Sequence, residues 1–458
     1  MPSTQSSSAS AGSPGPGGVL IVGGGQAAMQ LAISLRELGW QAAVTIAGDE
    51  PYAPYQRPPL SKAFLSGDAD AATLQFRSAE HYERERITVL PGRRVTHVRA
   101  AAPGRPGVAV TEAGDRLEFG RLALATGARP RPLPVPGTSL AGICYLRDVG
   151  HAIGLRERLT TARRVLVVGG GFIGLEAAAA ATARGKAVTV VEAADRLIGR
   201  VVSPAVSDFY AAAHRRRGVQ VLLSTAVSRF EGTVQANTGQ ANPGLANPGP
   251  ASTGPANAAP ADTGGAVTGA YLSDGGFVPA DLVIVGIGAE PRTELAEQLG
   301  LACDGGIVVD ACARTSDPAI VAAGDCAVTP HPAAADGALV RFESYGHALD
   351  HAKVAAATLA GVPAPYDAVP WFWSDQGTLK LQIAGLSGGF DQAVLRGDPG
   401  QERFSVLYYK DGRLLAVHAV NSPRDYLAVR RALTAGQEIP AELAADSAEP
   451  LRPAGAGV

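Results

Sequence analysis

The chain has 458 residues, of which 46% are hydrophobic, and its formal net charge is -2. At roughly 100–200 residues per domain, this length indicates a globular protein of about two to four domains. The near-zero net charge argues against nucleic acid or an anionic membrane surface as the main partner. The four cysteines (Cys144, Cys303, Cys312 and Cys326) form neither a C-x-x-C motif nor a zinc-site spacing. This usage is typical of a reduced cytoplasmic protein without a metal site, and it excludes a dithiol reductase.

Two segments are poor in large apolar side chains. Residues 1–18 are rich in Ser, Gly, Pro and Ala and lack the apolar core of a signal peptide, so we expect a disordered tail there. Residues 231–270 repeat Asn-Pro-Gly and similar turns, and they cannot bury enough surface to offset their ordering entropy. We expect them to form a flexible insertion in a hairpin turn. No apolar run approaches the roughly 20 residues of a membrane-spanning helix.

One pattern occurs twice in the chain. Residues 19–28 read VLIVGGGQAA, residues 164–174 read RVLVVGGGFIG, and an apolar-periodic stretch follows each. Each segment is expected to form a buried parallel strand, a glycine turn and a helix. The glycines let the backbone approach a pyrophosphate, which the amides at the helix N-terminus then bind. Two dinucleotide sites are therefore predicted, formed by Gly23, Gly25 and Ala28 and by Gly169, Gly171, Phe172, Ile173 and Gly174.

An acidic residue at the end of the second strand of such a unit binds ribose hydroxyls. In the second unit this residue is Glu192, whose charge would repel a 2′-phosphate and favours NADH over NADPH. Arg196 and Arg200 lie nearby in the sequence and weaken that preference. In the first unit the candidates are Asp49 and Glu50, one or two positions later than is ideal.

Three further strands end in small residues where the chain can cross against a cofactor. They lie at 122–129 (LALATGAR), 282–291 (LVIVGIGAEP) and 320–325 (IVAAGD). A carboxylate next to free backbone amides, as in the third strand, can hold a ribityl hydroxyl and a phosphate. The candidate cofactor residues in these segments are Ala125, Thr126, Gly127, Arg129, Gly286, Ile287, Gly288, Gly324 and Asp325.

After about residue 335 the sequence becomes strand-like. Strands are predicted near 379–384, 392–396, 404–410 and 414–420, and a helix over 422–435, with Ser422 as its N-cap and Pro423 in its first turn. This part is expected to be a smaller α+β domain.

At this point the chain resembles a known family. Besides the glycine motifs, the segments 49–62 (DEPYAPYQRPPLSK), 369–376 (VPWFWSDQ) and 421–431 (NSPRDYLAVRR) carry the resemblance. They look like the FAD-dependent ferredoxin reductases of the putidaredoxin, rubredoxin and oxygenase-component type, within the pyridine nucleotide–disulfide oxidoreductase fold. The resemblance covers roughly residues 19–445. The expected fold is α/β, with two interleaved Rossmann-like dinucleotide-binding domains plus a C-terminal α+β domain. The expected ranges are 19–138 and 292–335 for FAD, 139–291 for NADH and 336–445 for the third domain.

The resemblance also implies where the flavin would lie. Arg57, Pro58 and Lys62 would lie along FAD, and Lys62 would approach flavin N5 and pair with Glu176. A cation there stabilises negative charge on the reduced ring, and a buried lysine requires a carboxylate partner. Trp373 would pack beside the isoalloxazine, with Asp375 and Gln376 at its edge.

On the nicotinamide side, the resemblance places Glu343 near the cofactor. His347 stands where the relatives usually carry Asn. This histidine could replace the Asn hydrogen bonds, act as a pH-sensitive group, or be a satisfied structural residue, and the last interpretation is favoured.

The expected activity is transfer of a hydride from NADH to FAD, followed by single electrons to a [2Fe–2S] ferredoxin or a rubredoxin-like acceptor serving an oxygenase or a cytochrome P450. The acceptor is expected to dock near Arg413, Arg424, Arg430 and Arg431, and a homodimer is possible. Two alternatives are a flavin NADH oxidase or peroxidase and a signalling flavoprotein related to apoptosis-inducing factors. The absence of cysteine between residues 19 and 143 counts against the oxidase.

Overall fold

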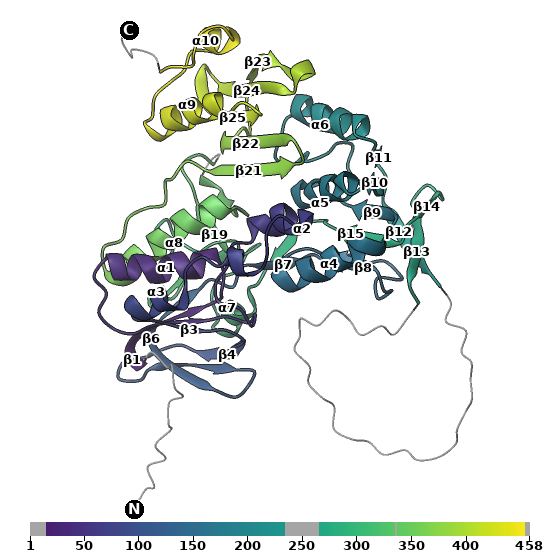
Figure 1. The fold of residues 1–458 in the computed structure, drawn as a ribbon. Coiled ribbons are helices and arrows are strands. Elements are labelled where there is room, and N and C mark those ends of the chain that lie inside the picture. Colours follow the sequence, from purple (N-terminus) through teal and green to yellow (C-terminus); the bar gives the residue numbers. More distant parts are fainter. Residues whose placement is uncertain (1–14, 234–264, 335–336, 454–458) are drawn as a thin grey trace, which may run out of the picture.

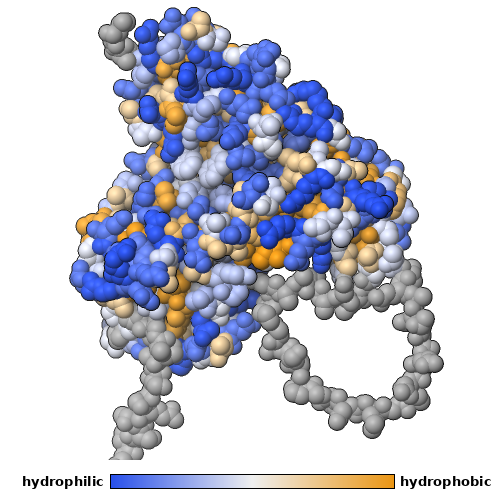
Figure 2. Space-filling model, viewed as in Figure 1, coloured by the Kyte–Doolittle hydropathy of each residue, from blue (hydrophilic) through white to orange (hydrophobic). Residues whose placement is uncertain are grey.

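The computed structural model describes residues 15–233, 265–334 and 337–453, which form three packed units (Figure 1). Two α/β units lie side by side, and a third unit lies against both of them. Within the described residues, none of the helices combines the length and apolarity needed to cross a bilayer. The surface seen in Figure 2 is mostly hydrophilic, with apolar side chains in scattered groups.

The first unit is built on a parallel sheet. Its strand order is β3-β2-β1-β6, with β18 on the other side of β6, and β5 and β4 extend the sheet in the antiparallel sense. The first strand begins four residues inside the predicted tail, and residues 1–14 lie outside the described part. The elements are β1 (Gly15–Val22), α1 (Gln26–Glu37), β2 (Val44–Ala47), β3 (Ile87–Leu90), β4 (Val95–Arg99), β5 (Gly107–Thr111), β6 (Arg116–Leu124) and β18 (Ile320–Ala322).

The second unit repeats this design with a fully parallel sheet in the order β11-β10-β9-β15-β8. A three-stranded antiparallel sheet, β12-β13-β14, is attached to it. The ends of the insertion predicted at 231–270 instead belong to β12 and β13, and residues 234–264 lie outside the described part. The elements are β8 (Ile143–Tyr145), α4 (Val149–Thr161), β9 (Arg164–Val168), α5 (Phe172–Ala183), β10 (Ala187–Val191), α6 (Pro204–Arg216), β11 (Gln220–Leu222), β12 (Val227–Gly232), β13 (Val267–Leu272), β14 (Phe277–Pro279) and β15 (Leu282–Val285).

The two α/β units are interleaved, as predicted. The chain leaves the first unit through β7 (Ala128–Pro130) and returns through β16 (Ala289–Pro291), and these two strands pair with each other in the antiparallel sense. Beyond the return, β18 pairs with β6 and completes the first sheet. The shorter elements are η1 (Pro58–Ser61), α2 (Ala63–Ser66), η2 (Ala72–Leu74), α3 (Ala79–Arg84), α7 (Glu294–Gln298), β17 (Ile307–Val308), β19 (Ala327–Pro330) and β20 (Leu339–Val340).

The third unit is an antiparallel sheet in the order β21-β22-β25-β24-β23. The edge strand β23 alternates buried and exposed residues, whereas the central strands β24 and β25 are buried along most of their length. Helix α9 packs its apolar face against β22 and β25. The predicted helix over 422–435 is confirmed as α9. The elements are β21 (Trp371–Gln376), β22 (Leu379–Gly385), β23 (Gln392–Asp398), η4 (Pro399–Gln401), β24 (Arg403–Lys410), β25 (Arg413–Val420), α9 (Pro423–Thr434) and α10 (Ala441–Ala445).

The long helix α8 (Tyr345–Ala360) belongs to the first unit by its packing. It lies beside α1 (Figure 1), and Ala352, Ala355 and Ala356 share one hydrophobic core with Leu31 and Leu35. The small side chains of α8 let the two helices approach closely. The predicted start of the third domain at residue 336 is therefore too early, because the strands of that unit begin only with β21.

Candidate active site

All three units contribute residues to one elongated cavity. Its lining comes from the first glycine turn, the segment after β2, η1, α5 and β21, among other parts of the chain. The predicted site residues that line it are Gly23, Gly25, Asp49, Glu50, Arg57, Pro58, Lys62, Ala125, Thr126, Gly127, Ile173, Glu176, Gly324, Asp325, Glu343 and Trp373.

The first glycine turn is shaped for close approach. Gly23 has φ of +126°, and a Cβ built on it would lie 2.0 Å from the carbonyl oxygen of Ala125. Gly25 is the N-cap of α1 and offers no side chain to the free amides of the first turn. Next to it, both amide atoms of the Gln26 side chain are buried and have no protein partner. These donors and acceptors fit a polar ligand such as a pyrophosphate.

Two ion pairs that the sequence did not predict order the acidic residues of this cavity. Asp49 Oδ2 lies 2.7 Å from Nη1 of Arg292, and Asp325 Oδ2 lies 2.7 Å from Nη2 of Arg147. Arg147 follows β8 in the second unit, and Arg292 follows β16, where the chain returns to the first unit. Each arginine is therefore far from its partner in the sequence. Sequence reasoning had no local signal for these pairs, since only the crossing of the two units brings them together.

The glutamate at position 50 is also held by neighbours. Nη2 of Arg57 lies 2.5 Å from Oε1 of Glu50, and the hydroxyl of Tyr55 donates to Oε2 of the same carboxylate. Arg57 also donates to the backbone carbonyl of Arg147 at 3.0 Å. The carboxylate and the hydroxyl lie at the cavity wall, so Glu50, Tyr55 and Arg57 form one hydrogen-bonded polar group there.

Lys62 and Glu176 meet as the resemblance implied. Nζ of Lys62 lies 2.8 Å from Oε2 of Glu176, whose side chain is only 1% exposed, whereas that of Lys62 is 16% exposed. Ser61 donates to the same carboxylate oxygen, and Ser374 donates to the other at 2.6 Å. The lysine ammonium thus faces the cavity while its counter-charge is buried behind it.

Aromatic side chains form the far wall of the cavity. Trp373 and Phe372 line it from β21, and Tyr345 packs edge-on against Trp373 with 5.7 Å between ring centres. A flat apolar wall beside a cation is the environment expected for an isoalloxazine. Gln376, predicted at the flavin edge, is instead buried and hydrogen-bonded to His214, because strand alternation places it on the face opposite Asp375.

The second glycine motif forms a separate turn, and of its predicted residues only Ile173 lines this cavity. A Cβ on Gly169 would lie 2.4 Å from the carbonyl oxygen of Gly286, and one on Gly174 would lie 2.1 Å from that of Gly169. Gly171 is the N-cap of α5 and leaves the amides of that helix end without a side-chain cap. The arrangement matches the first turn with one difference. The first turn accommodates Ala28 at the position where the second turn has room only for Gly174. Ile287 and Gly288 follow Gly286 at the same turn.

The carboxylate of Glu192, predicted to bind ribose hydroxyls, lies at the second turn and accepts hydrogen bonds from backbone amides. Its Oε2 accepts a 2.6 Å hydrogen bond from the Gly170 amide, and its Oε1 accepts one of 2.8 Å from Ala194. Of the two nearby cations, Arg196 donates to the carbonyl oxygens of Val202 at 2.8 Å and Gly199 at 2.7 Å. These bonds hold the Arg196 guanidinium against the backbone, which reduces its availability for a 2′-phosphate. Arg200 lies beside the second turn, where a Cβ built on Gly288 would be 3.5 Å from its Nη2.

Some predicted residues lie elsewhere. Arg129 does not line the cavity, because its guanidinium pairs with Glu294 at 2.5 Å on the surface. Phe172 packs against Phe372, with ring centres 4.5 Å apart, and Ala28 is fully buried beneath the turn.

His347 is 3% exposed, its Nδ1 lies 2.9 Å from the Tyr366 hydroxyl, and burial lowers its pKa to about 3. The buried neutral ring agrees with a structural role, but only Nδ1 is paired, because Nε2 is buried without a protein partner. Glu343, in contrast, lines the cavity and pairs with Arg341 at 2.6 Å.

Residues 17–356 match the pyridine nucleotide–disulphide oxidoreductase family, and residues 371–455 match the reductase C-terminal family. The chain therefore belongs to the pyridine nucleotide–disulphide oxidoreductase family. It is 41% identical to rhodocoxin reductase of Rhodococcus erythropolis over 429 residues, which cover 94% of this chain and 92% of that protein. It is 38% identical to putidaredoxin reductase of Pseudomonas putida over 437 residues, which cover 95% and 96% of the two chains.

Solved structures agree with this assignment. A ferredoxin reductase from Rhodopseudomonas palustris matches with a TM-score of 0.82 and 39% identity, over 94% of this chain and 97% of that one. Putidaredoxin reductase in its covalent complex with putidaredoxin matches with a TM-score of 0.83 and 37% identity, over 94% and 96%. The predicted fold class and the predicted resemblance to ferredoxin reductases are confirmed, and the chain is an oxidoreductase of this type.

Proposed function

We propose that the chain is an FAD-dependent NADH:ferredoxin oxidoreductase whose acceptor carries a [2Fe–2S] cluster. The observation that carries the proposal is that the Lys62–Glu176 pair and Trp373 line one cavity, which also includes a phosphate-binding type of glycine turn. When bound, FAD accepts a hydride from the nicotinamide and releases electrons singly to an iron–sulfur acceptor. The four cysteines, all free, support the predicted cytoplasmic location.

The residues of the first unit would hold FAD. The uncapped start of α1 and the Gln26 amide supply hydrogen bonds to the pyrophosphate, and Glu50 and Asp49 face the ribose position. Asp325, fixed by Arg147, supplies an acceptor for ribityl hydroxyls. The ammonium of Lys62 supplies positive charge to the redox ring, and Trp373 excludes water from one side of it.

The residues of the second unit would hold NADH. The start of α5 supplies free amides, and Glu192 supplies a carboxylate for the ribose hydroxyls that also repels a 2′-phosphate. Ile173, in the first turn of α5, is 41% exposed and lines the flavin cavity, so this helix end faces both sites. The nicotinamide can therefore reach the cavity from α5, close to Glu343.

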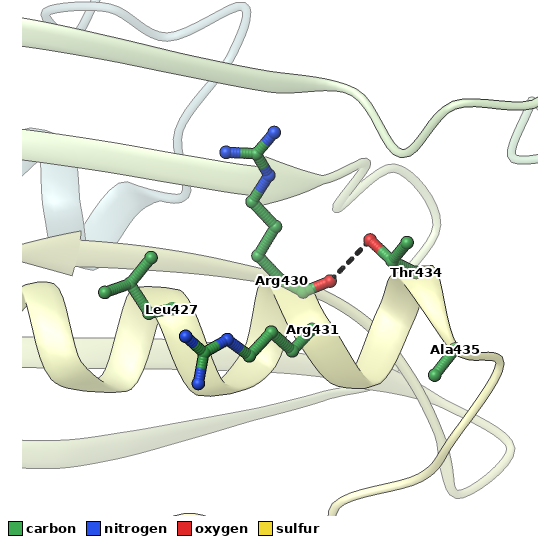
Figure 3. Close-up of a pocket in the computed structure, with 5 residues that line it drawn as sticks. All are labelled: Leu427, Arg430, Arg431, Thr434 and Ala435. Atoms are coloured by element: carbon green, nitrogen blue, oxygen red, sulfur yellow. Dashed lines mark hydrogen bonds between the residues drawn. The ribbon is translucent and has the colours of Figure 1, made fainter.

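For acceptor docking, the proposal names the exposed side of α9. Arg430, Arg431, Leu427, Thr434 and Ala435 line a groove on this helix, and Figure 3 shows the two arginines leaving the helix in different directions. The Arg430 guanidinium lies 4.5 Å from the ring centre of Trp371, which stacks on Trp373 at 5.7 Å. Aromatic contacts thus connect this basic groove with the cavity. Arg413 contributes less, because it faces Glu438 at 3.8 Å.

Anaerobic stopped-flow measurements would test the proposal. The FAD-loaded protein is reduced with NADH, and then a [2Fe–2S] ferredoxin or dioxygen is added in parallel. Fast reoxidation by the ferredoxin and slow reoxidation by dioxygen are expected. Fast reaction with dioxygen and no preference for the ferredoxin would instead identify an oxidase, and slow reaction with both would favour a signalling flavoprotein.

A further inference from the structure

Glu176 is the end of a buried hydrogen-bonded chain that runs through the third unit. Ser374 donates to its Oε1 at 2.6 Å, and Nε2 of Gln376 lies 3.3 Å from the Ser374 oxygen. Oε1 of Gln376 lies 2.7 Å from Nε2 of His214 on α6. Ser374, Gln376 and His214 are each at most 1% exposed, so bulk water does not compete for these bonds.

The donor and the acceptor of each hydrogen bond in this chain follow from the ionised Glu176 carboxylate. Ionised Glu176 only accepts, so the single hydroxyl proton of Ser374 must point to it. The Ser374 oxygen must then accept from the Gln376 amide, which turns the Gln376 carbonyl towards His214. His214 therefore carries its proton on Nε2. Burial lowers the pKa of His214, which agrees with a neutral ring, and its Nδ1 is buried without a protein partner.

We propose that Ser374, Gln376 and His214 are positioning residues, which hold Glu176 in the orientation that anchors Lys62 beside the flavin. All donors of the chain point towards one carboxylate, whose other oxygen receives Lys62 and Ser61. Ser374 and Gln376 lie on the same face of β21, and the intervening strand residue faces the other way. Docking of the third unit thereby fixes the charge at the reaction centre. The inference rests on the proposed function.

The first variant to examine is Ser374→Ala. Without this donor, Glu176 keeps more uncompensated charge and loses its fixed orientation, and both effects disfavour negative charge on the reduced flavin. We expect a more negative midpoint potential for the bound FAD and an approximately tenfold slower reduction by saturating NADH, about 1.4 kcal/mol in activation free energy. FAD content and the apparent affinity for NADH should stay unchanged. Ser374→Thr, which retains the hydroxyl, should restore the potential.

The protein has a matched control residue, Ser405, in the same antiparallel sheet. Ser405 is also 0% exposed and donates to a carboxylate, that of Asp425, at 2.9 Å, but it lies outside the chain that ends at Glu176. Ser405→Ala should lower the thermal midpoint in the same way as Ser374→Ala and leave the flavin potential unchanged. Gln376→Met provides a second interruption of the chain, with the same expected shift in potential as Ser374→Ala.

The outcomes separate the two levels of the argument. If wild-type protein contains no FAD that NADH reduces, the proposed function is wrong and the inference falls with it. If the wild type is reduced by NADH, but Ser374→Ala and Gln376→Met match Ser405→Ala in potential and in reduction rate, the chain is structural only and the inference alone is overturned. A shifted potential in both chain variants, with rescue by Ser374→Thr, supports it.

Discussion

Lys62 and Glu176 form an asymmetric ion pair, because the carboxylate side chain is 1% exposed and the ammonium side chain is 16% exposed. Removing the two partners should therefore have unequal effects. Lys62→Met leaves a buried charge without its counter-ion and should cost about 3 kcal/mol, whereas Glu176→Gln lets Lys62 turn towards the cavity and should cost clearly less. Denaturant midpoints of both variants and of the double variant would measure this. Equal single losses that add in the double variant would contradict the expected coupling.

Charge on α9 should control the encounter with an acidic acceptor. Arg431 is exposed, whereas Arg430 also covers the Trp371 ring. We therefore expect Arg431→Glu to lower the association rate with a ferredoxin about tenfold at low salt and to flatten its salt dependence, with the NADH half-reaction unchanged. Arg105→Glu, on the turn between β4 and β5 at the other end of the molecule (Figure 1), makes the same charge change and should have no such effect. Similar rates for both variants would locate docking elsewhere.

Glu192 should set the preference for the nicotinamide cofactor. Its carboxylate closes the second glycine turn, and Arg196 is bound to backbone carbonyls. Glu192→Gln retains the shape and removes the repulsion of a 2′-phosphate, so the NADPH-to-NADH ratio of kcat/KM should rise about tenfold. Asp274→Asn, in the turn between β13 and β14, is the control for a lost charge in the same unit. An unchanged ratio in Glu192→Gln would show that other residues select the cofactor.

The two glycine turns should respond differently to alanine. A Cβ at Gly25 meets nothing within 4 Å and enters the cavity, whereas one at Gly174 would lie 2.1 Å from a backbone oxygen. Gly25→Ala should leave the thermal midpoint of the apoprotein unchanged and weaken FAD binding at least about tenfold, as measured by fluorescence on reconstitution. Gly174→Ala should lower the thermal midpoint. Full FAD retention in Gly25→Ala would argue against the cofactor assignment of this turn.

Local patterns in the sequence account for much of this structure. Both glycine turns and α9 were predictable, because periodicity and turn chemistry act over short distances. The interleaving of the two units was expected only from the resemblance to ferredoxin reductases. The Asp49–Arg292 and Arg147–Asp325 pairs were not, since their partners meet only when the chain crosses between units. The affiliation of α8 was missed for the same reason: an alanine-rich helix does not reveal which partner it packs against.

The hydrogen bond between Gln376 and His214 shows a second limit of prediction from the sequence. Its place in the segment 369–376 suggested a position at the flavin edge, but a strand alternates its faces, and the choice of face depends on what covers each side. Here α6 covers one face and supplies His214. The sequence contains no signal that links residue 214 to residue 376, so the chain that ends at Glu176 became visible only in the structure.

Buried histidines should make the protein sensitive to mild acid. Burial lowers the pKa values of His347 and His418 to about 3, and that of His351 well below its usual value. Between pH 6.5 and 3 the unfolded chain therefore binds more protons than the folded one, and stability falls as pH falls. At pH 5 each such histidine should reduce the free energy of unfolding by about 2 kcal/mol relative to pH 7.5.

Denaturant midpoints at pH 7.5 and pH 5.0 would measure this loss. His347→Asn should show a smaller decrease in stability between the two pH values, because asparagine does not titrate. Its stability should be lower than that of the wild type at both pH values, because the hydrogen bond to Tyr366 weakens. His97→Asn, at an exposed position on β4, should keep the wild-type pH dependence. Equal wild-type midpoints at the two pH values would mean that the buried histidines gain protons without unfolding, for example by opening of the space between α8 and Tyr366.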